Sequence, residues 1–76
     1  MEQEQVLKRF GERLRELRVA SGLTQEDLAL QASVDRGFIS ETETGGRNPS
    51  VWVVYRLARA LGVDPGALLP RSDDWA

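Results

Sequence analysis

The sequence contains no cysteine and no histidine among its 76 residues. Without cysteine the chain has no disulfide framework and no thiolate metal site. Without histidine it lacks the commonest general base and metal ligand. Catalysis would then need a carboxylate pair in a pocket, and the chain also lacks a glycine-rich phosphate-binding loop. We therefore expect a protein that is not an enzyme and that binds no cofactor, metal ion or small-molecule ligand.

Long hydrophobic runs are also absent from the sequence. No apolar stretch reaches the roughly 18 residues that a membrane-spanning helix needs, and residues 1–10 lack the apolar segment of a signal peptide. We expect a cytoplasmic protein that consists of a single domain, residues 1–76, with an ordered core at 5–70. The tails, residues 1–4 and 71–76, are expected to be flexible.

Positive charge is scarce as well, with ten Lys and Arg residues against twelve Asp and Glu residues. The basic residues concentrate in 8–18 and 44–71, whereas several acidic residues lie between 26 and 43. Contacts between basic side chains and phosphates supply most non-specific affinity for DNA. An acidic middle segment would therefore be unusual for a surface that approaches phosphates.

The stretch 24–44 contains the strongest structural signal. Thr24 is suited to cap a helix, and Asp27 follows at the spacing of a capping box. Apolar positions then repeat with helical spacing until the pattern breaks at 33–34, after which Asp35 offers a second cap. The pattern predicts two short helices, at about 25–31 and 36–43, in a helix-turn-helix arrangement.

Three further helices are expected around this pair, at about 5–20, at 51–61 and in a last short helix that begins at Pro65. The fold class is therefore all-α, a compact five-helix domain. In the first helix the spacing of apolar residues predicts a core-facing stripe. In the helix at 51–61 the predicted core face consists of Val51, Val54, Leu57, Ala58 and Leu61.

Three runs carry a family resemblance: GLTQEDLA at 22–29, DRGFIS at 35–40 and GGRNPS at 45–50. They resemble the lambda-repressor-like (Cro/cI, XRE) helix-turn-helix family over residues 10–69. The second and third runs particularly resemble the controller proteins of restriction-modification systems. The resemblance implies a homodimer that binds double-stranded DNA at a palindromic operator.

The expected DNA-reading surface is the N-terminal half of the second helix of the pair, because such helices enter the major groove. Arg36 is the strongest candidate, since a guanidinium can bond both acceptors of a guanine edge. Glu41 either accepts a hydrogen bond from cytosine or repels the DNA backbone. Gly37 either permits close approach to the groove or is a tolerated defect. The complete set of expected DNA-binding residues is Thr24, Gln25, Asp35, Arg36, Gly37, Ser40, Glu41, Arg47 and Asn48.

Several of these roles rest on the resemblance alone. It implies that Gln25 bonds a phosphate and braces the base-reading side chain. It also implies phosphate contacts for Arg47 and Asn48, whose alternatives are a solvated side chain and a turn-holding side chain. Finally, it implies a structural ion pair between Arg18 and Glu43.

Two positions depart from the family pattern. Thr42 replaces a large apolar residue that usually holds the reading helix to the core, and Ser33 replaces the glycine common in the turn. We therefore expect a less firmly held helix and a mildly strained turn.

Large apolar residues are also expected at the surface. Trp52 and Val53 are predicted on the outward side of the helix at 51–61, and such exposure often marks an interface. The resemblance adds residues around the last helix, so the expected dimer interface comprises Trp52, Val53, Pro65, Leu68 and Leu69.

Two functions fit these observations. The first is a homodimeric transcriptional regulator, of the repressor or restriction-modification controller type. The alternative is a protein-interaction module on the same fold, such as an antitoxin or antirepressor, with weak or altered DNA binding.

Overall fold

The computed structural model describes residues 1–71. Residues 72–76, which belong to the tail expected to be flexible, lie outside the described part. The elements are α1 (Gln3–Ala20), α2 (Gln25–Ala32), α3 (Arg36–Glu43), α4 (Val51–Leu61) and the 3₁₀ helix η1 (Pro65–Leu68). The all-α prediction is confirmed, but the predicted fifth helix is a single 3₁₀ turn that gives way to extended backbone at Leu69.

Helix α1 begins at Gln3, two residues earlier than predicted, so residues 3 and 4 are helical rather than frayed. The backbone N–H of Glu2 donates to Gln5 Oε1 at 2.8 Å, and the carbonyl of Glu2 accepts from the N–H of Val6 at 3.1 Å. The first bond pairs a backbone N–H that would otherwise be orphaned at the start of the helix, and the second is the first i to i−4 bond of the helix. At the other end, Gly22 adopts a positive φ of 73°, as expected of a left-handed helix stop.

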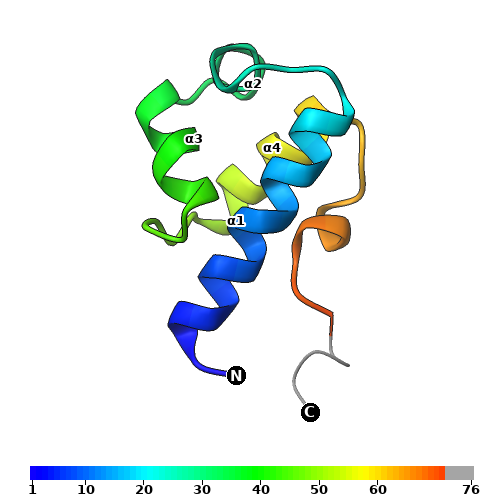
Figure 1. Ribbon diagram of the computed structural model, residues 1–76. Helices are drawn as coiled ribbons and strands as arrows, with labels where there is room; N and C mark the ends of the chain where they lie inside the picture. The colour runs from blue at the N-terminus through cyan, green and yellow to red at the C-terminus, as the bar shows by residue number, and fades with distance from the viewer. Residues whose placement is uncertain (72–76) are drawn as a thin grey trace.

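The helices enclose one small core, with α1 running the length of the molecule (Figure 1). Helix α3 lies on one side of α1 and η1 on the other, while α2 lies near the C-terminal end of α1. None of the helices within residues 1–71 is long and apolar enough to cross a membrane. The buried apolar residues are Phe10, Leu14, Leu28, Ala29, Ala32, Ile39, Leu57, Ala58, Leu61 and Leu68.

The predicted core face of α4 is wrong at its first residue. Val51 is 87% exposed, because it lies at the first position of α4, before the helix reaches the core. Val54 packs partly against the core as predicted, and Val53, which was predicted on the outward side, also packs partly against it. The capped start of α4, where Ser50 Oγ accepts from the N–H of Val53, fixes this register.

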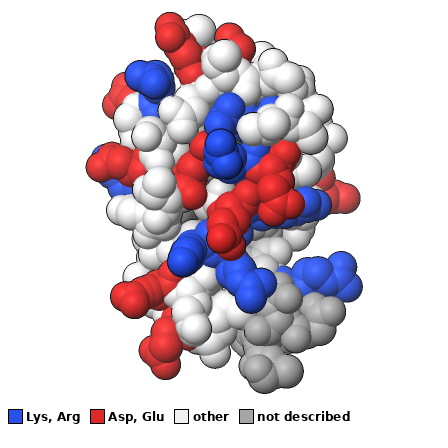
Figure 2. All heavy atoms as spheres, in the orientation of Figure 1, with Lys and Arg blue, Asp and Glu red and all other residues white. Residues whose placement is uncertain are grey.

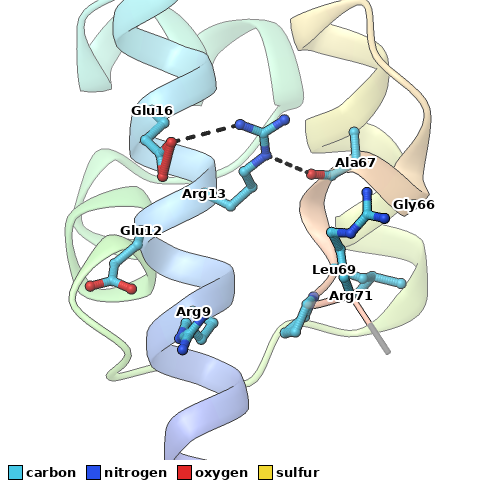
Figure 3. Close-up of a pocket in the computed structure, with 9 residues that line it drawn as sticks. Arg9, Glu12, Arg13, Glu16, Gly66, Ala67, Leu69 and Arg71 are labelled. Atoms are coloured by element: carbon cyan, nitrogen blue, oxygen red, sulfur yellow. Dashed lines mark hydrogen bonds and ion pairs between the residues drawn. The ribbon is translucent and has the colours of Figure 1, made fainter. Parts of the chain in front are cut away.

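Arg13 joins η1 to α1. Its Nε donates to the carbonyl of Ala67 at 3.0 Å, and its guanidinium lies 3.7 Å from Glu16 (Figure 3).

Acidic and basic side chains alternate over the face of the molecule that Figure 2 shows, and they form no uniformly basic field there. Phosphate binding on this face would therefore depend on individually placed cations.

Candidate nucleic-acid interface

The start of α2 is held by a reciprocal pair of hydrogen bonds. Thr24 Oγ1 accepts from the N–H of Asp27, and Asp27 Oδ2 accepts from the N–H of Thr24, each at 3.0 Å. The hydrogen bond that the Asp27 carboxylate accepts from the Thr24 backbone N–H is the main cause that lowers the pKa of Asp27 below its ordinary value. The Thr24 side chain lowers this pKa further. Thr24 is therefore engaged in capping, and the helix N-terminus that it closes carries a partial positive charge suited to an anion.

The turn between α2 and α3 is left-handed at Ser33, whose φ is 58°. Among residues 1–71, no other non-glycine residue has a positive φ. This conformation costs a modest amount of free energy for a residue that has a Cβ. It agrees with the mild strain expected where serine replaces the glycine common in this turn. The Ser33 carbonyl accepts a hydrogen bond from the Arg56 guanidinium at 3.2 Å, which helps to hold the turn.

The N-terminal half of α3 is exposed. Asp35 lies at the N-cap position, as predicted, but its side chain makes no capping hydrogen bond. Arg36 and Gly37 are both exposed, and Ser40, one turn later, is partly buried. Within residues 1–71 the Arg36 side chain has no hydrogen-bond or ion-pair partner, so its donors remain available. A Cβ placed on Gly37 would meet nothing within 4 Å.

The C-terminal end of α3 is anchored to α1 and α2 by a network around a buried carboxylate. Glu43 accepts from Arg18 Nε at 2.6 Å and from a second Arg18 nitrogen at 3.1 Å. Gln25 Nε2 donates to the same carboxylate at 3.1 Å, and Arg18 also donates to the Leu23 carbonyl. The hydrogen bond with Glu43 raises the pKa of Arg18, against the opposing effect of burial. Arg18 and Glu43 thus form the expected ion pair, and one amide N–H of Gln25 is engaged there.

A close approach of backbones, which the sequence reasoning missed, accompanies this network. A Cβ placed on Gly11 of α1 would lie only 2.3 Å from the carbonyl oxygen of Thr42 and 2.7 Å from that of Glu43. Glycine is therefore required where α1 crosses α3. The available signal was a glycine within the predicted first helix, one residue after the apolar Phe10, where it costs helix propensity.

The turn after α3 carries Arg47 and Asn48, both exposed. Arg47 Nε lies 3.1 Å from Glu41 Oε1, and its guanidinium carbon lies 5.4 Å from the centroid of the Phe38 ring. Glu41, a predicted DNA-binding residue, is therefore already paired with a basic residue of the same chain. This ion pair was not anticipated from the sequence.

The expected dimer interface needs two corrections. Leu68 is fully buried in the core, and Val53 packs partly against the core, so neither is a surface side chain of the kind predicted. The large exposed side chains at the start of α4 are instead Val51, Trp52 and Tyr55, which we call the α4 patch. Trp52 is 62% exposed, Tyr55 is 48% exposed, and their rings stack with centroids 5.9 Å apart. Of the remaining predicted interface residues, Pro65 is partly buried and Leu69 is exposed.

A shallow pocket lies between α1 and the segment that contains η1. It has a volume of about 280 Å³, and its lining includes charges of both signs (Figure 3). Arg9, Arg13 and Arg71 face it together with Glu12 and Glu16. In the part of the chain that the structure describes, no group of three His, Cys, Asp or Glu side chains is arranged to hold a metal ion.

Comparison with known proteins places this geometry in a family. A family profile described as "Helix-turn-helix domain" matches residues 9–71. The chain is 39% identical over 61 residues to the control protein C.BamHI from Bacillus amyloliquefaciens, covering 79% of this chain and 75% of that protein. An uncharacterised helix-turn-helix transcriptional regulator from Sinorhizobium fredii is 37% identical over 67 residues, covering 88% of this chain and 87% of the regulator.

Solved structures of similar proteins have the same fold as this chain. The restriction-modification controller protein C.AhdI from Aeromonas hydrophila superimposes with a TM-score of 0.81 at 46% identity, covering 83% of this chain and 96% of that chain. A variant of the restriction-modification controller protein C.Esp1396I gives a TM-score of 0.76 at 31% identity, covering 82% and 78%. The match spans the capped α2, the exposed start of α3 and the turn that follows. The chain therefore belongs to the lambda-repressor-like helix-turn-helix family of DNA-binding transcriptional regulators.

Proposed function

We propose that the protein acts as a cytoplasmic homodimer on a palindromic DNA operator, as a repressor or restriction-modification controller, with no enzymatic activity. The observation that carries the proposal is the exposed Arg36, which has no polar partner within residues 1–71 and lies on the helix that the family sets against DNA. Its guanidinium can bond O6 and N7 of one guanine in the major groove.

The other DNA-binding residues surround Arg36 in supporting roles. The N-terminus of α2, at Thr24 and Gln25, would receive one backbone phosphate. Arg47 and Asn48, exposed in the turn after α3, would contact further phosphates. Asp35 and Ser40 border the reading face, and Gly37 leaves space for close approach to the groove floor. These contacts position the helix, whereas base contacts determine the preferred sequence.

The similarity to C.BamHI and C.AhdI supports the controller type, because both relatives are named as proteins of that kind. A two-fold dimer would present its two α3 helices about 34 Å apart, one turn of B-DNA. The α4 patch fits the dimer contact, since its stacked aromatic pair would otherwise remain in water.

Mobility shifts on DNA from upstream of the gene test the reading role. Arg36→Ala should weaken operator binding by roughly 5- to 150-fold, the equivalent of one bidentate base contact. Arg59→Ala is the matched control, because it removes an exposed arginine from the C-terminal part of α4. Equal losses in the two variants, or no binding of the wild type at low salt, would count against the proposal and favour the protein-interaction alternative.

Sedimentation equilibrium tests the dimer contact. Trp52→Ala should raise the dimer dissociation constant at least about tenfold, as expected for a large aromatic residue at an interface centre. Leu30→Ala is the control, since Leu30 is a 73% exposed apolar residue on α2. An unchanged dissociation constant in Trp52→Ala would exclude the α4 patch as the dimer interface.

A further inference from the structure

Glu41 and Arg47 form an ion pair beside the expected DNA-binding surface. The distance from Arg47 Nε to Glu41 Oε1 is 3.1 Å, and both side chains are about half exposed. The Arg47 guanidinium also lies over the ring of Phe38, one helical turn before Glu41 on α3. Arg47 therefore lies along the outer side of α3 instead of extending into solvent.

The backbone of the turn fixes this arrangement. The carbonyl of Glu41 accepts from the N–H of Gly46 at 2.8 Å, from the N–H of Thr44 at 3.3 Å and from Thr44 Oγ1 at 3.0 Å. These three bonds bring the turn back onto the last turn of α3, so the residue after Gly46 starts beside the Glu41 side chain. The ion pair thus follows from the fold of the turn as well as from the attraction of the two charges.

We propose that Glu41 competes intramolecularly with DNA phosphate for Arg47, and thereby lowers the affinity of the protein for every duplex. This inference rests on the proposed function, in which Arg47 contacts the backbone. The carboxylate occupies Arg47 Nε and offsets the charge of the guanidinium, so a phosphate that engages this Nε must displace Glu41. Once Arg47 has turned to phosphate, the Glu41 carboxylate is left unpaired near the DNA backbone.

The competition is weak enough to permit binding. Exposed ion pairs are worth only a small stabilisation, and phosphate contacts are reinforced by the release of counterions. The consequence is a similar penalty on operator and unrelated duplexes, because Arg47 contacts the backbone in both. Glu41 therefore acts on overall affinity through Arg47 and without touching a base.

A double-mutant cycle tests the inference by titrating operator and unrelated duplexes with the full chain. Glu41→Gln should bind both duplexes about 2- to 5-fold more tightly, the range that an exposed ion pair supplies. Arg47→Gln should bind both more weakly, with a salt slope smaller by about one. In Glu41→Gln/Arg47→Gln the gain from the Glu41 change should vanish, because no competition remains.

Glu26→Gln is the matched control, since Glu26 is an exposed acid on α2 that makes no ion pair with Arg47 in the structure. Any gain that it produces should persist unchanged in the Arg47→Gln background. If the Glu41 gain also persists there, Glu41 acts by simple repulsion and the inference is overturned. Weaker operator binding with lost discrimination in Glu41→Gln would overturn it too, in favour of a base contact. A wild-type chain that binds no duplex would overturn the proposed function itself.

Discussion

The two ends of α3 are held in very different ways. The C-terminal end is buried: Ile39 and Thr42 face the core, and Glu43 is bound by Arg18 and Gln25. The N-terminal end is exposed and begins at Asp35, whose side chain makes no capping bond. Helix α3 is thus fixed at its C-terminal end, which leaves open the Arg36 end that we propose reads DNA.

The largest loss of stability should come from a substitution that disrupts the buried C-terminal end of α3. Arg18→Met would leave the Glu43 carboxylate, whose side chain is 3% exposed, without its charged partner. Removing one partner of a buried pair typically costs about 3–5 kcal/mol, so the free energy of unfolding should fall by that amount in urea titrations. Arg18→Met/Glu43→Leu should recover much of the loss, because both charges are then removed. A double variant as unstable as the single one would show that packing, and not charge, is what Arg18 supplies.

The next effect concerns the crossing of α1 and α3. Gly11→Ala would place a methyl group 2.3 Å from the Thr42 carbonyl oxygen, so the two helices must separate. We expect a loss of about 2–3 kcal/mol of unfolding free energy, as in other overpacked sites. The measurement is thermal unfolding monitored by circular dichroism.

Gly37→Ala is the matched glycine replacement at the exposed N-terminal end of α3. Nothing lies within 4 Å of the added methyl group, and alanine favours a helix by up to about 1 kcal/mol. Unfolding free energy should therefore rise slightly. Weaker DNA binding in this stable variant would show that Gly37 permits close approach to the groove, whereas unchanged binding would identify a tolerated defect.

A gain in stability is also expected from the core side of α3. The Oγ1 atom of Thr42 is buried and has no hydrogen-bond partner. Because an unpaired buried hydroxyl is costly, Thr42→Val should stabilise the protein by about 1 kcal/mol and raise its melting temperature by about 4–8 °C. Thr44→Val is the control, since Thr44 Oγ1 donates to the Glu41 carbonyl and its loss should not stabilise. Equal effects in the two variants would contradict this reasoning.

The contrast between the ends also marks what the sequence could predict. The bounds of α3 and α4, and α2 to within one residue, followed from caps and apolar spacing, which are local properties. The Arg18–Glu43 pair came from the family resemblance. The Gly11 contact and the Glu41–Arg47 pair depend on how separate elements meet, and no local pattern encodes that. The misassigned exposure of Val51 and Val53 has the same origin, because periodicity locates a helix face but not where the core ends.

The smallest effect on stability is expected from a comparison of two helix starts. The start of α2 has a side-chain cap, whereas the start of α3 has none. Asp27 has a pKa lowered from 3.8 by its bonds with Thr24, so its carboxylate form is favoured in the folded state. The associated stability is present above the unfolded pKa and is lost as the pH falls through the lowered folded value. Asp27→Asn should therefore be less stable than the wild type at pH 7, and the difference should shrink below about pH 3.8. Asp35→Asn should change stability less at pH 7, because the Asp35 side chain makes no capping bond. Equal losses at the two positions, measured by urea titration, would mean that helix-dipole attraction alone accounts for both.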